Sequence, residues 1–367
     1  MSIVNVRPEE DCRWDIASLG EVMLRLDPGA GRIHTTRAFD VWEGGGEYNV
    51  ARGLRRCFSR RATLVSALAD NPIGRLVEDL ILQGGVDTSH LNWKTYDGVG
   101  RETRNGINFV ERGLGPRGAL SCSDRGHTAV SQMQASDVDL KRLFEEEGVR
   151  LLHTGGIYAA LGDASAQAAA ELMKRARETG TCVSYDLNYR ASLWNARGGQ
   201  AAAQQINREL VKNVDVLFGN EEDFHACLGF EIEGTDENYS ELDTSAFRRM
   251  ILQVMEAYPR LQLVATTLRV AHTASRNDWG AICYHRASDK FFEVPPEPVE
   301  IFDRVGGGDS FASGVLEGIL RAEEPAWALA CGVAHGALAM STPGDTTMAT
   351  KGEVERLMQG ANARIDR

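Results

Sequence analysis

Apolar runs of strand length alternate with helical patterns through the second half of the chain. The runs cover residues 149–152, 181–187, 214–218 and 261–268, and an Ala-rich stretch at 164–179 is followed by Gly180, which can cap a helix. Strands that alternate with helices are typical of a parallel sheet with helices on both of its faces. The sequence therefore predicts an α/β fold with a doubly wound, mostly parallel sheet.

Three of these predicted strands run into polar or glycine-rich segments, at 153–156, 186–190 and 219–223. Ligands of doubly wound sheets bind beyond the carboxyl ends of the strands. The three segments therefore predict a binding site along one edge of the sheet.

The first part of the chain follows another pattern. Residues 15–26 are expected to form a strand of the main sheet. Segments at about 27–48 and 92–133 hold strand-like pieces with turns, such as 106–110 and 119–123, and lack a helical period. We expect these two segments to form a small β sheet that projects as a lid. The core helix between them is marked by apolar residues on one face: Val50, Leu54, Cys57 and Phe58.

These patterns suggest a single large domain. We expect an N-terminal tail at 1–14, the α/β domain with its lid at 15–350, and a C-terminal helix of the same domain at 351–367.

Composition and charge narrow the function. The 367 residues are 43% hydrophobic and 25% charged, as in ordinary globular proteins, and the net charge is −12. This charge argues against nucleic acid or an anionic membrane as a partner, and it means that a bound anion needs local help. No apolar run could span a bilayer, and the first residues do not resemble a signal peptide. The seven dispersed cysteines indicate free thiols in a reducing cytoplasm.

The segment from Asp303 to Asp309 has the strongest chemical character. Its three glycines, Gly306, Gly307 and Gly308, allow the backbone to approach a ligand closely, and apolar residues after Asp309 have helical spacing. Asp309 would then lie at a helix N-terminus, where unpaired N–H groups attract anions. A carboxylate there could remove a hydroxyl proton while the N–H groups hold phosphoryl charge. Alternatively, the segment is a plain glycine turn with Asp as its N-cap.

Several familiar motifs are absent from the sequence. It contains no G-x-x-x-x-G-K-[ST] and no G-x-G-x-x-G after a strand, which excludes a P-loop and weakens a nicotinamide dehydrogenase interpretation. No H-E-x-x-H or Cys/His cluster suggests zinc.

Two distant glycine clusters fit one function. Gly44, Gly45 and Gly46 with Asn49 could hold sugar hydroxyls, while the cluster before Asp309 holds phosphate. This combination resembles the ribokinase-like carbohydrate kinases of the PfkB family over nearly the whole chain. The first signature of that family, a Gly-Gly pair followed by Asn and Ala, is matched at residues 45–51. The second, usually D-T-x-G-A-G-D, is matched at 303–309, where Arg304 and Gly307 depart from the commonest pattern.

The resemblance implies a ribokinase-like fold, ATP as phosphoryl donor, Mg²⁺ and, in some relatives, a monovalent cation. The family's N-x-x-E element is matched at Asn220–Asp223, with Asp in the usual Glu position, so Asp223 or Glu222 would orient Mg²⁺ through water. These acidic residues could also simply favour the first turn of a helix. The resemblance further implies a set of nucleotide-binding residues: Asn220, Thr267, Arg269, Gly306, Gly308 and His335.

A further segment points to the sugar. Residues 186–194 look like the D-x-N-x-R-x-x-L-W stretch of 2-keto-3-deoxygluconate kinases, and Arg125 matches their lid arginine. The resemblance implies that the acceptor is 2-keto-3-deoxygluconate or a close sugar acid, phosphorylated at the C6 hydroxyl. The expected substrate-binding residues are Gly45, Gly46, Asn49, Arg125, Asn188, Arg190 and Asp309. An aldonate carries a carboxylate that Arg pairs with well. Arg125 and Arg190 could instead form structural salt bridges.

Other functions remain open on the sequence alone. The nearest are fructokinase and 5-dehydro-2-deoxygluconokinase, and the non-enzymatic one is a sugar-binding regulatory protein on the same fold. We also expect a homodimer formed through the lids, or a higher homo-oligomer. A few-stranded insert is marginal by itself, and pairing two of them hides their edges.

Overall fold

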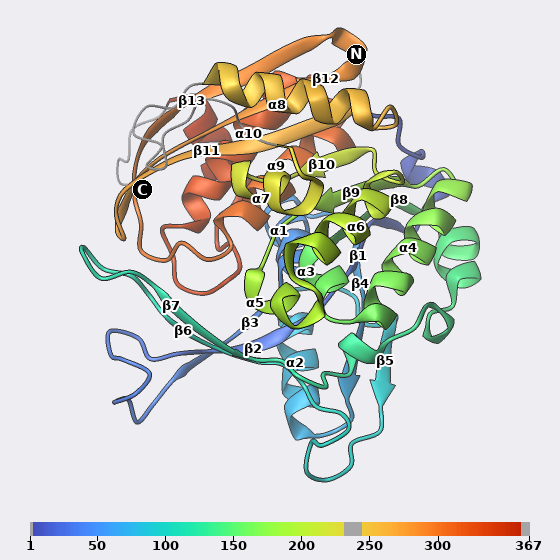
Figure 1. The fold of residues 1–367 in the computed structure, drawn as a ribbon, viewed down its shortest axis with the longest axis vertical. Helices are drawn as coiled ribbons and strands as arrows, with labels where there is room; N and C mark the ends of the chain where they lie inside the picture. The colour runs from blue at the N-terminus through green and yellow to red at the C-terminus, as the bar shows by residue number, and fades with distance from the viewer. Residues whose placement is uncertain (1–2, 231–243, 361–367) are drawn as a thin grey trace.

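The computed structural model describes residues 3–230 and 244–360 and centres on one large sheet (Figure 1). Its nine described strands lie in the order β13-β12-β11-β10-β9-β8-β1-β4-β5. The strands from β11 to β5 are parallel, and β12 and β13 extend the sheet as antiparallel neighbours. Their bounds are β1 Trp14–Leu19, β4 Ala62–Ala69, β5 Leu91–Lys94, β8 Val149–Gly155, β9 Cys182–Asp186, β10 Val216–Phe218, β11 Leu263–Thr273, β12 Arg276–His285 and β13 Lys290–Glu300.

Helices cover both faces of this sheet, as its alternating side chains require. In β10, Val216 and Phe218 enter one apolar core while Leu217 enters the other. One face carries α1 Gly46–Phe58, α2 Pro72–Gln83, α9 Gly307–Leu320, α10 Pro325–Ala339 and α11 Lys351–Met358. The other carries α3 Gly156–Ala160, α4 Asp163–Glu178, α6 Gly199–Val211, α7 Glu221–Leu228 and α8 Thr244–Ala257, and α5 Ala191–Trp194 packs beside α6. None of the described helices has both the length and the apolar character needed to cross a bilayer.

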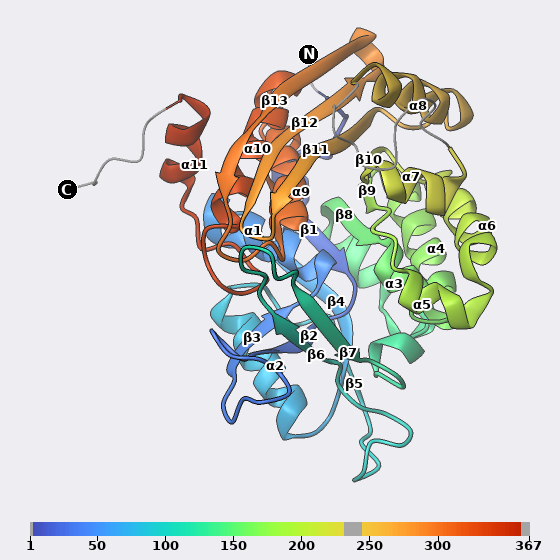
Figure 2. The ribbon, with the colours of Figure 1, turned by 60° about the vertical axis from the view of Figure 1, so that its left-hand side comes forward.

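A second, four-stranded sheet projects from the first and forms the lid (Figure 2). Its strands lie in the order β3-β2-β6-β7, with bounds β2 Met23–Asp27, β3 Asp40–Gly44, β6 Ile107–Glu111 and β7 Leu120–Asp124. The predicted ribokinase-like architecture, a large mostly parallel sheet with a small β lid, is confirmed.

Most predicted elements are found close to their expected places. The four strands expected from 149 onward are β8, β9, β10 and β11, and the Ala-rich helix is α4. The antiparallel pair of β12 and β13 was not predicted. Of the C-terminal helix expected at 351–367, α11 covers Lys351–Met358, and residues 361–367 lie outside the described part. Ahead of β1, Ile3 and Val4 are buried, and His285 Nε2 lies 3.0 Å from the Ile3 carbonyl oxygen.

One strand prediction was wrong. We expected residues 15–26 to form a single core strand, but the chain turns after β1 and enters the lid as β2. The turn is tight, since only residues 20–22 separate the two strands. Gly20 packs against the Glu47 side chain, which leaves no room for a Cβ there. Apolar residues continue through this turn, so periodicity alone cannot reveal it. In addition, β5, which overlaps the start of the expected second lid segment, pairs with β4 in the main sheet.

All seven cysteines are free thiols, as predicted. Six of them are buried, and Cys122 is exposed on lid strand β7.

A buried cluster of charges, centred on Arg25 of β2, ties the lid to the main body. The Arg25 guanidinium is 1% exposed and donates to Asp27 over 2.8 Å, to Asp303 over 2.5 Å and to Asp345 over 2.7 Å. Asp303 and Asp345 belong to loops on either side of α9 and α10. One lid side chain therefore holds two loops of the main domain in place.

Replacing Arg25 with Ala is expected to lower the free energy of unfolding by about 3–5 kcal/mol, because Asp303 and Asp345 would remain buried without their cation. Asp27 would keep its ion pair with Arg112. Burial, opposed by Arg25, raises the pKa of Asp345 to about 6. The loss should therefore be smaller at pH 5 than at pH 8, since protonation lets this carboxyl be buried uncharged. Chemical denaturation at the two pH values measures the loss.

The matched control for this experiment is Lys141→Ala, which removes an ion pair whose two side chains are largely exposed. Its unfolding curve should be unchanged. An Arg25→Ala curve that coincides with that of the control would contradict a structural role for the cluster.

Candidate active site

A cavity of about 780 Å³ opens at the carboxyl edge of the parallel strands, between the main sheet and the lid. It is lined by the residues after β1, β9 and β10, by the start of α1, by β6 and β7 of the lid, and by the loop that leads into α9. Of the three polar segments expected at the site, 186–190 and 219–223 contribute to the cavity, whereas residues 153–156 are buried and do not line it. The expected binding edge is therefore where the cavity lies.

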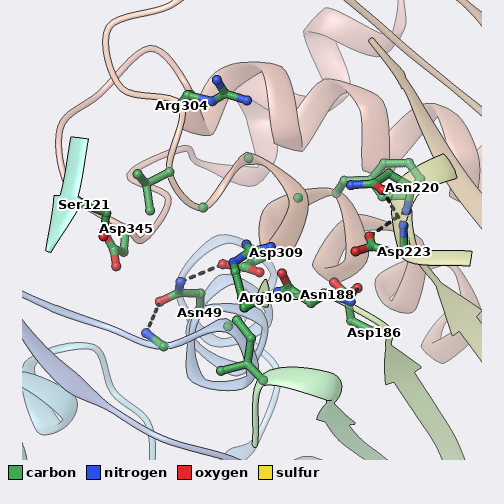
Figure 3. A pocket seen from close by; sticks show the side chains of 18 of the residues that line it. Asn49, Ser121, Asp186, Asn188, Arg190, Asn220, Asp223, Arg304, Asp309 and Asp345 are labelled. Atoms are coloured by element: carbon green, nitrogen blue, oxygen red, sulfur yellow. Dashed lines mark hydrogen bonds between the residues drawn. The ribbon is translucent and has the colours of Figure 1, made fainter. Parts of the chain in front are cut away.

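The two glycine clusters meet at this cavity, although they are far apart in the sequence (Figure 3). Asn49 in the first turn of α1 donates through Nδ2 to Asp309 Oδ2 over 2.7 Å, and its Oδ1 accepts the Gly45 N–H over 3.2 Å. A Cβ on Gly46 would lie 3.5 Å from Asn188 Nδ2 and 3.6 Å from Asp309 Oδ1. The N-termini of α1 and α9 and the end of β9 thus converge on Asp309.

The turn before Asp309 requires glycine for two reasons. Gly306 has a φ of 79°, in the left-handed region, and a Cβ there would lie 1.9 Å from the Asp345 carbonyl oxygen. Gly308 faces open space at the cavity. The turn therefore opens α9 with uncovered backbone N–H groups, and the first N–H groups of a helix have no intrahelical partner.

Asp309 has the electrostatic character of a base. Burial raises its pKa to about 6, while the hydrogen bond from Asn49 opposes that shift, Asp345 adds to it and Arg190 opposes it. A carboxylate with this pKa is ionised at neutral pH, yet accepts a proton more readily than a solvated Asp does.

The residues expected to bind substrate all line the cavity. Arg125 of the lid donates through Nε and Nη2 to Glu21 Oε2, over 2.9 and 2.6 Å. Arg190 donates to the Tyr189 carbonyl oxygen over 2.7 Å and has no ion pair among the described residues. Asn188 has a φ of 33°, unusual for a residue with a side chain, and its N–H donates to Asp186 Oδ1 over 3.2 Å.

Most of the residues expected to bind the nucleotide also line the cavity: Asn220, Thr267, Arg269, Gly306 and Gly308. His335 does not. It is fully buried on α10, its ring lies 5.1 Å from that of Phe58, and burial lowers its pKa to about 4. The placement of His335 at the nucleotide was wrong, because this part of α10 faces α1 in the core.

The acidic residues expected near Mg²⁺ differ in position. Asp223 lines the cavity, and its two oxygens accept the N–H groups of Asn220 over 2.8 Å and Tyr189 over 2.7 Å. Asn220 Oδ1 in turn accepts the Asp223 N–H over 2.9 Å, so Asp223 completes a capping box at the start of α7. Glu222 is exposed and does not line the cavity.

Other carboxylates that we did not expect lie close by. Burial, then the neighbouring Asp223 and Asp309, raise the pKa of Asp186. Within residues 3–230 and 244–360, no group of three or more His, Cys, Asp or Glu could hold a metal ion. Asp186 and Asp223 could still hold water molecules around a Mg²⁺ whose other ligands are phosphate oxygens, as this ion prefers.

The sequence analysis also missed several residues that line the cavity: Glu21, Glu47, Asp186, Arg304 and Asp345. Two of these residues could have been predicted from their sequence context. Glu47 follows the first glycine cluster, and Asp186 begins the segment that contains Asn188 and Arg190. Burial raises the pKa of Glu47 to about 7, and Asp309 and Glu21 add to that shift. Glu21 lies in the turn between β1 and β2, which we predicted as strand, so it could not have been placed at the cavity.

Comparisons with known proteins agree with this geometry. A family model described as pfkB family carbohydrate kinase matches residues 14–351. The chain is 30% identical to a 2-dehydro-3-deoxygalactonokinase of Haloferax volcanii, over 96% of this chain and 99% of that protein. It is 24% identical to a 5-dehydro-2-deoxygluconokinase of Clostridium perfringens, over 91% and 89% of the two chains.

A solved structure is similar to this chain in both fold and sequence. The crystal structure of 2-dehydro-3-deoxygluconokinase from Thermotoga maritima has a TM-score of 0.85 and 32% identity, and the match covers 94% of this chain and 99% of that one. A family match over most of the chain, with relatives at this level of identity across their whole length, leads to one conclusion. The chain belongs to the pfkB family of carbohydrate kinases.

Proposed function

We propose that this carbohydrate kinase transfers the γ-phosphoryl group of ATP to the C6 hydroxyl of 2-keto-3-deoxygluconate or a close sugar acid. The observation that carries the proposal is the contact between Asn49 and Asp309, which brings a hydroxyl-binding helix start against a base at an anion-binding helix start. The names of two relatives with 30% identity or more, both kinases of 2-dehydro-3-deoxy sugar acids, support this choice of substrate.

The residues of the chain divide the reaction between them. Asp309 accepts the proton of the hydroxyl, whose oxygen forms the new bond to the γ-phosphorus as the bond to the β-phosphate oxygen breaks. The N–H groups at the Gly306–Gly308 turn stabilise the charge on the transferred group. Asn49 holds Asp309 in position, and closure of the lid over the cavity excludes water that could accept the phosphoryl group instead.

The same proposal assigns the remaining roles. Asn220, Thr267 and Arg269 lie where they could hold the nucleotide. Mg²⁺, when bound, would offset phosphate charge, with Asp186 and Asp223 contacting it through water. A monovalent cation, which the resemblance to the family allows, enters no step of this mechanism. The free thiols support a cytoplasmic location.

The acid group of the substrate is assigned to two arginines. Arg190 lies after β9 and Arg125 lies on the lid, so they approach the cavity from different directions. A carboxylate enclosed by the closing lid is costly to bury unless it is paired. Two guanidinium groups would provide that pairing, and a neutral ketohexose would gain nothing from them.

Asp309→Asn should leave the fold and ATP binding intact and lower kcat by ~10²–10⁴-fold or more, because the amide cannot take the proton. In the unmutated enzyme, kcat/KM should fall as the pH drops through about 6, since protonation of Asp309 removes the base. A coupled assay of ADP release in the presence of Mg²⁺ measures the kcat of the variant and the pH dependence of kcat/KM. The same assay with excess chelator is the inactive control. Near-normal turnover by the folded variant would remove Asp309 from the mechanism.

Arg190→Ala and Arg125→Ala should each lower kcat/KM on 2-keto-3-deoxygluconate by about ten- to a hundred-fold, and lower it much less on fructose. Because Arg125→Ala leaves Glu21 buried without its cation, the variant is also made together with Glu21→Gln. The measurement compares the kcat/KM of each variant on 2-keto-3-deoxygluconate, on its galactonate epimer and on fructose. Equal losses on acid and neutral sugars would mean that the arginines only shape the cavity.

The same panel tests the substrate itself. If the unmutated enzyme prefers fructose, the chain is a fructokinase, and preference for 5-dehydro-2-deoxygluconate would make it a kinase of that sugar acid. If no sugar is phosphorylated although ATP and sugar bind, the non-enzymatic alternative takes the place of the proposal.

We also propose a homodimer formed through the lids. The outer strands β3 and β7 leave one backbone edge each without a described partner strand, and all five residues of β7 are exposed. Such edges pair readily with other chains. Sedimentation should give twice the chain mass at micromolar concentration. Glu substitution at exposed Leu120 of β7 should shift the protein toward monomer, and a monomer mass independent of concentration would contradict the proposal.

A further inference from the structure

The cavity is poor in positive charge for a site that takes a nucleoside triphosphate. Six carboxylate side chains line it, from Glu21, Glu47, Asp186, Asp223, Asp309 and Asp345, against four arginines, and the whole chain carries a net charge of −12. There is no P-loop lysine in the sequence. Any cation that faces the phosphates therefore has a large effect on whether they bind.

The four arginines are not equivalent. Arg125 is paired with Glu21, whereas Arg190, Arg269 and Arg304 form no ion pair within residues 3–230 and 244–360. All three line the same cavity. Partial desolvation lowers the pKa of Arg304, and repulsion from Arg269 and then Arg190 lowers it further. Arginines that line one cavity and form no ion pair, in an acidic protein, are typical of a site that binds an anion.

Arg304 has a position suited to phosphate. It stands between Asp303, which is fixed by Arg25 over 2.5 Å, and the turn that begins α9. The backbone on either side is held as well, because the Asp303 N–H donates to the Met340 carbonyl oxygen over 3.2 Å and the Val305 N–H to Asp303 Oδ1 over 3.2 Å. The base of the side chain is thus rigid, while the guanidinium is exposed at the cavity.

The side of the cavity on which Arg304 lies also bears on which ligand it could contact. Figure 3 shows Arg304 on the loop that leads to Asp309, with the glycine turn between its side chain and Asn49. Asn49 marks the sugar side of Asp309. Arg269 of β11, whose charge acts most strongly on Arg304 among its neighbours, belongs to the strand that carries Thr267. Arg304 therefore lies on the side from which the phosphoryl donor must approach.

We propose that Arg304 is a phosphate-binding residue of this enzyme, and that its guanidinium contacts the terminal phosphoryl group of ATP. As the bond between the γ-phosphorus and the β-phosphate oxygen breaks, the proton of the acceptor goes to Asp309 and Arg304 stays charged, offsetting the charge on the oxygens. The inference rests on the proposed function in taking ATP as the donor and in placing the sugar on the Asn49 side of Asp309. Arg304 stands at the Thr position of the D-T-x-G-A-G-D pattern that residues 303–309 resemble, so this charge is an addition that the pattern does not supply.

The test is calorimetric binding of ATP, ADP and AMP in the presence of Mg²⁺ and the absence of sugar. Arg304→Ala should weaken ATP binding by about ten- to a hundred-fold, ADP binding less, and AMP binding not at all. Arg304→Thr should behave like Arg304→Ala, and Arg304→Lys should recover part of the affinity because it keeps a charge without the planar fork. Arg101→Ala, which removes an exposed arginine of the 97–102 loop, is the control and should bind all three nucleotides normally.

A kinetic measurement completes the test. With the best sugar substrate, Arg304→Ala should raise KM for ATP and lower kcat, while KM for the sugar stays unchanged. Equal weakening of ATP, ADP and AMP, or unchanged ATP affinity, would overturn the proposal. Because binding is measured without sugar, failure of the sugar-acid assignment would leave this result standing, and failure of Arg304 would leave the sugar acid in place.

Discussion

The hydrogen bonds from Arg25 to Asp27, Asp303 and Asp345 set the relation between the lid and the rest of the molecule. A guanidinium can serve three carboxylates at once because its donors spread in one plane. Burial makes this cluster costly to assemble and more costly to break. The cluster fixes the positions of two loops. Asp345 packs against Gly306 and Gly44, and Asp303 begins the loop that carries the glycine turn. The position of the glycine turn thus depends on a lid strand, and a shift of β2 would disturb that turn.

The cavity separates two kinds of charge. Buried carboxylates lie around Asp309, and each raises the pKa of its neighbours once burial has removed their water. This surrounding is suited to holding a proton that has left a hydroxyl group. Of the arginines without an ion pair among the described residues, Arg190 lies beside Asp309, whereas Arg304 and Arg269 lie by the glycine turn and on β11. A single site can therefore favour proton uptake at one end and negative charge at the other, with a few residues between them.

The local features of this site could be predicted from the sequence, and the long-range ones could not. The glycine turn, the first turn of α1 and the polar ends of β9 and β10 each lie within a few residues of a strand or helix signal, so their meeting at one sheet edge follows from topology. The Arg25–Asp345 contact joins residues 320 positions apart, and periodicity carries no information on it. His335 was misplaced for a related reason. Helix α10 is apolar almost throughout, so its sequence does not reveal which side faces the core.

If Arg125 binds the acid group of the substrate, as proposed, its pairing with Glu21 affects what a measured affinity would mean. An arginine already engaged by a carboxylate cannot give its full interaction to an incoming acid. The ligand must either share the guanidinium, through Nη1, or displace Glu21 from it. The net gain in binding free energy is then the difference between the contact of the acid with Arg125 and the contact of Glu21 that it replaces. Such an exchange favours selectivity over tight binding, because a neutral sugar cannot replace Glu21 while an acid replaces it with little net change. The pairing with Glu21 also keeps the Arg125 side chain in place before the substrate binds. The conformational entropy of that side chain is therefore already lost when an acid arrives.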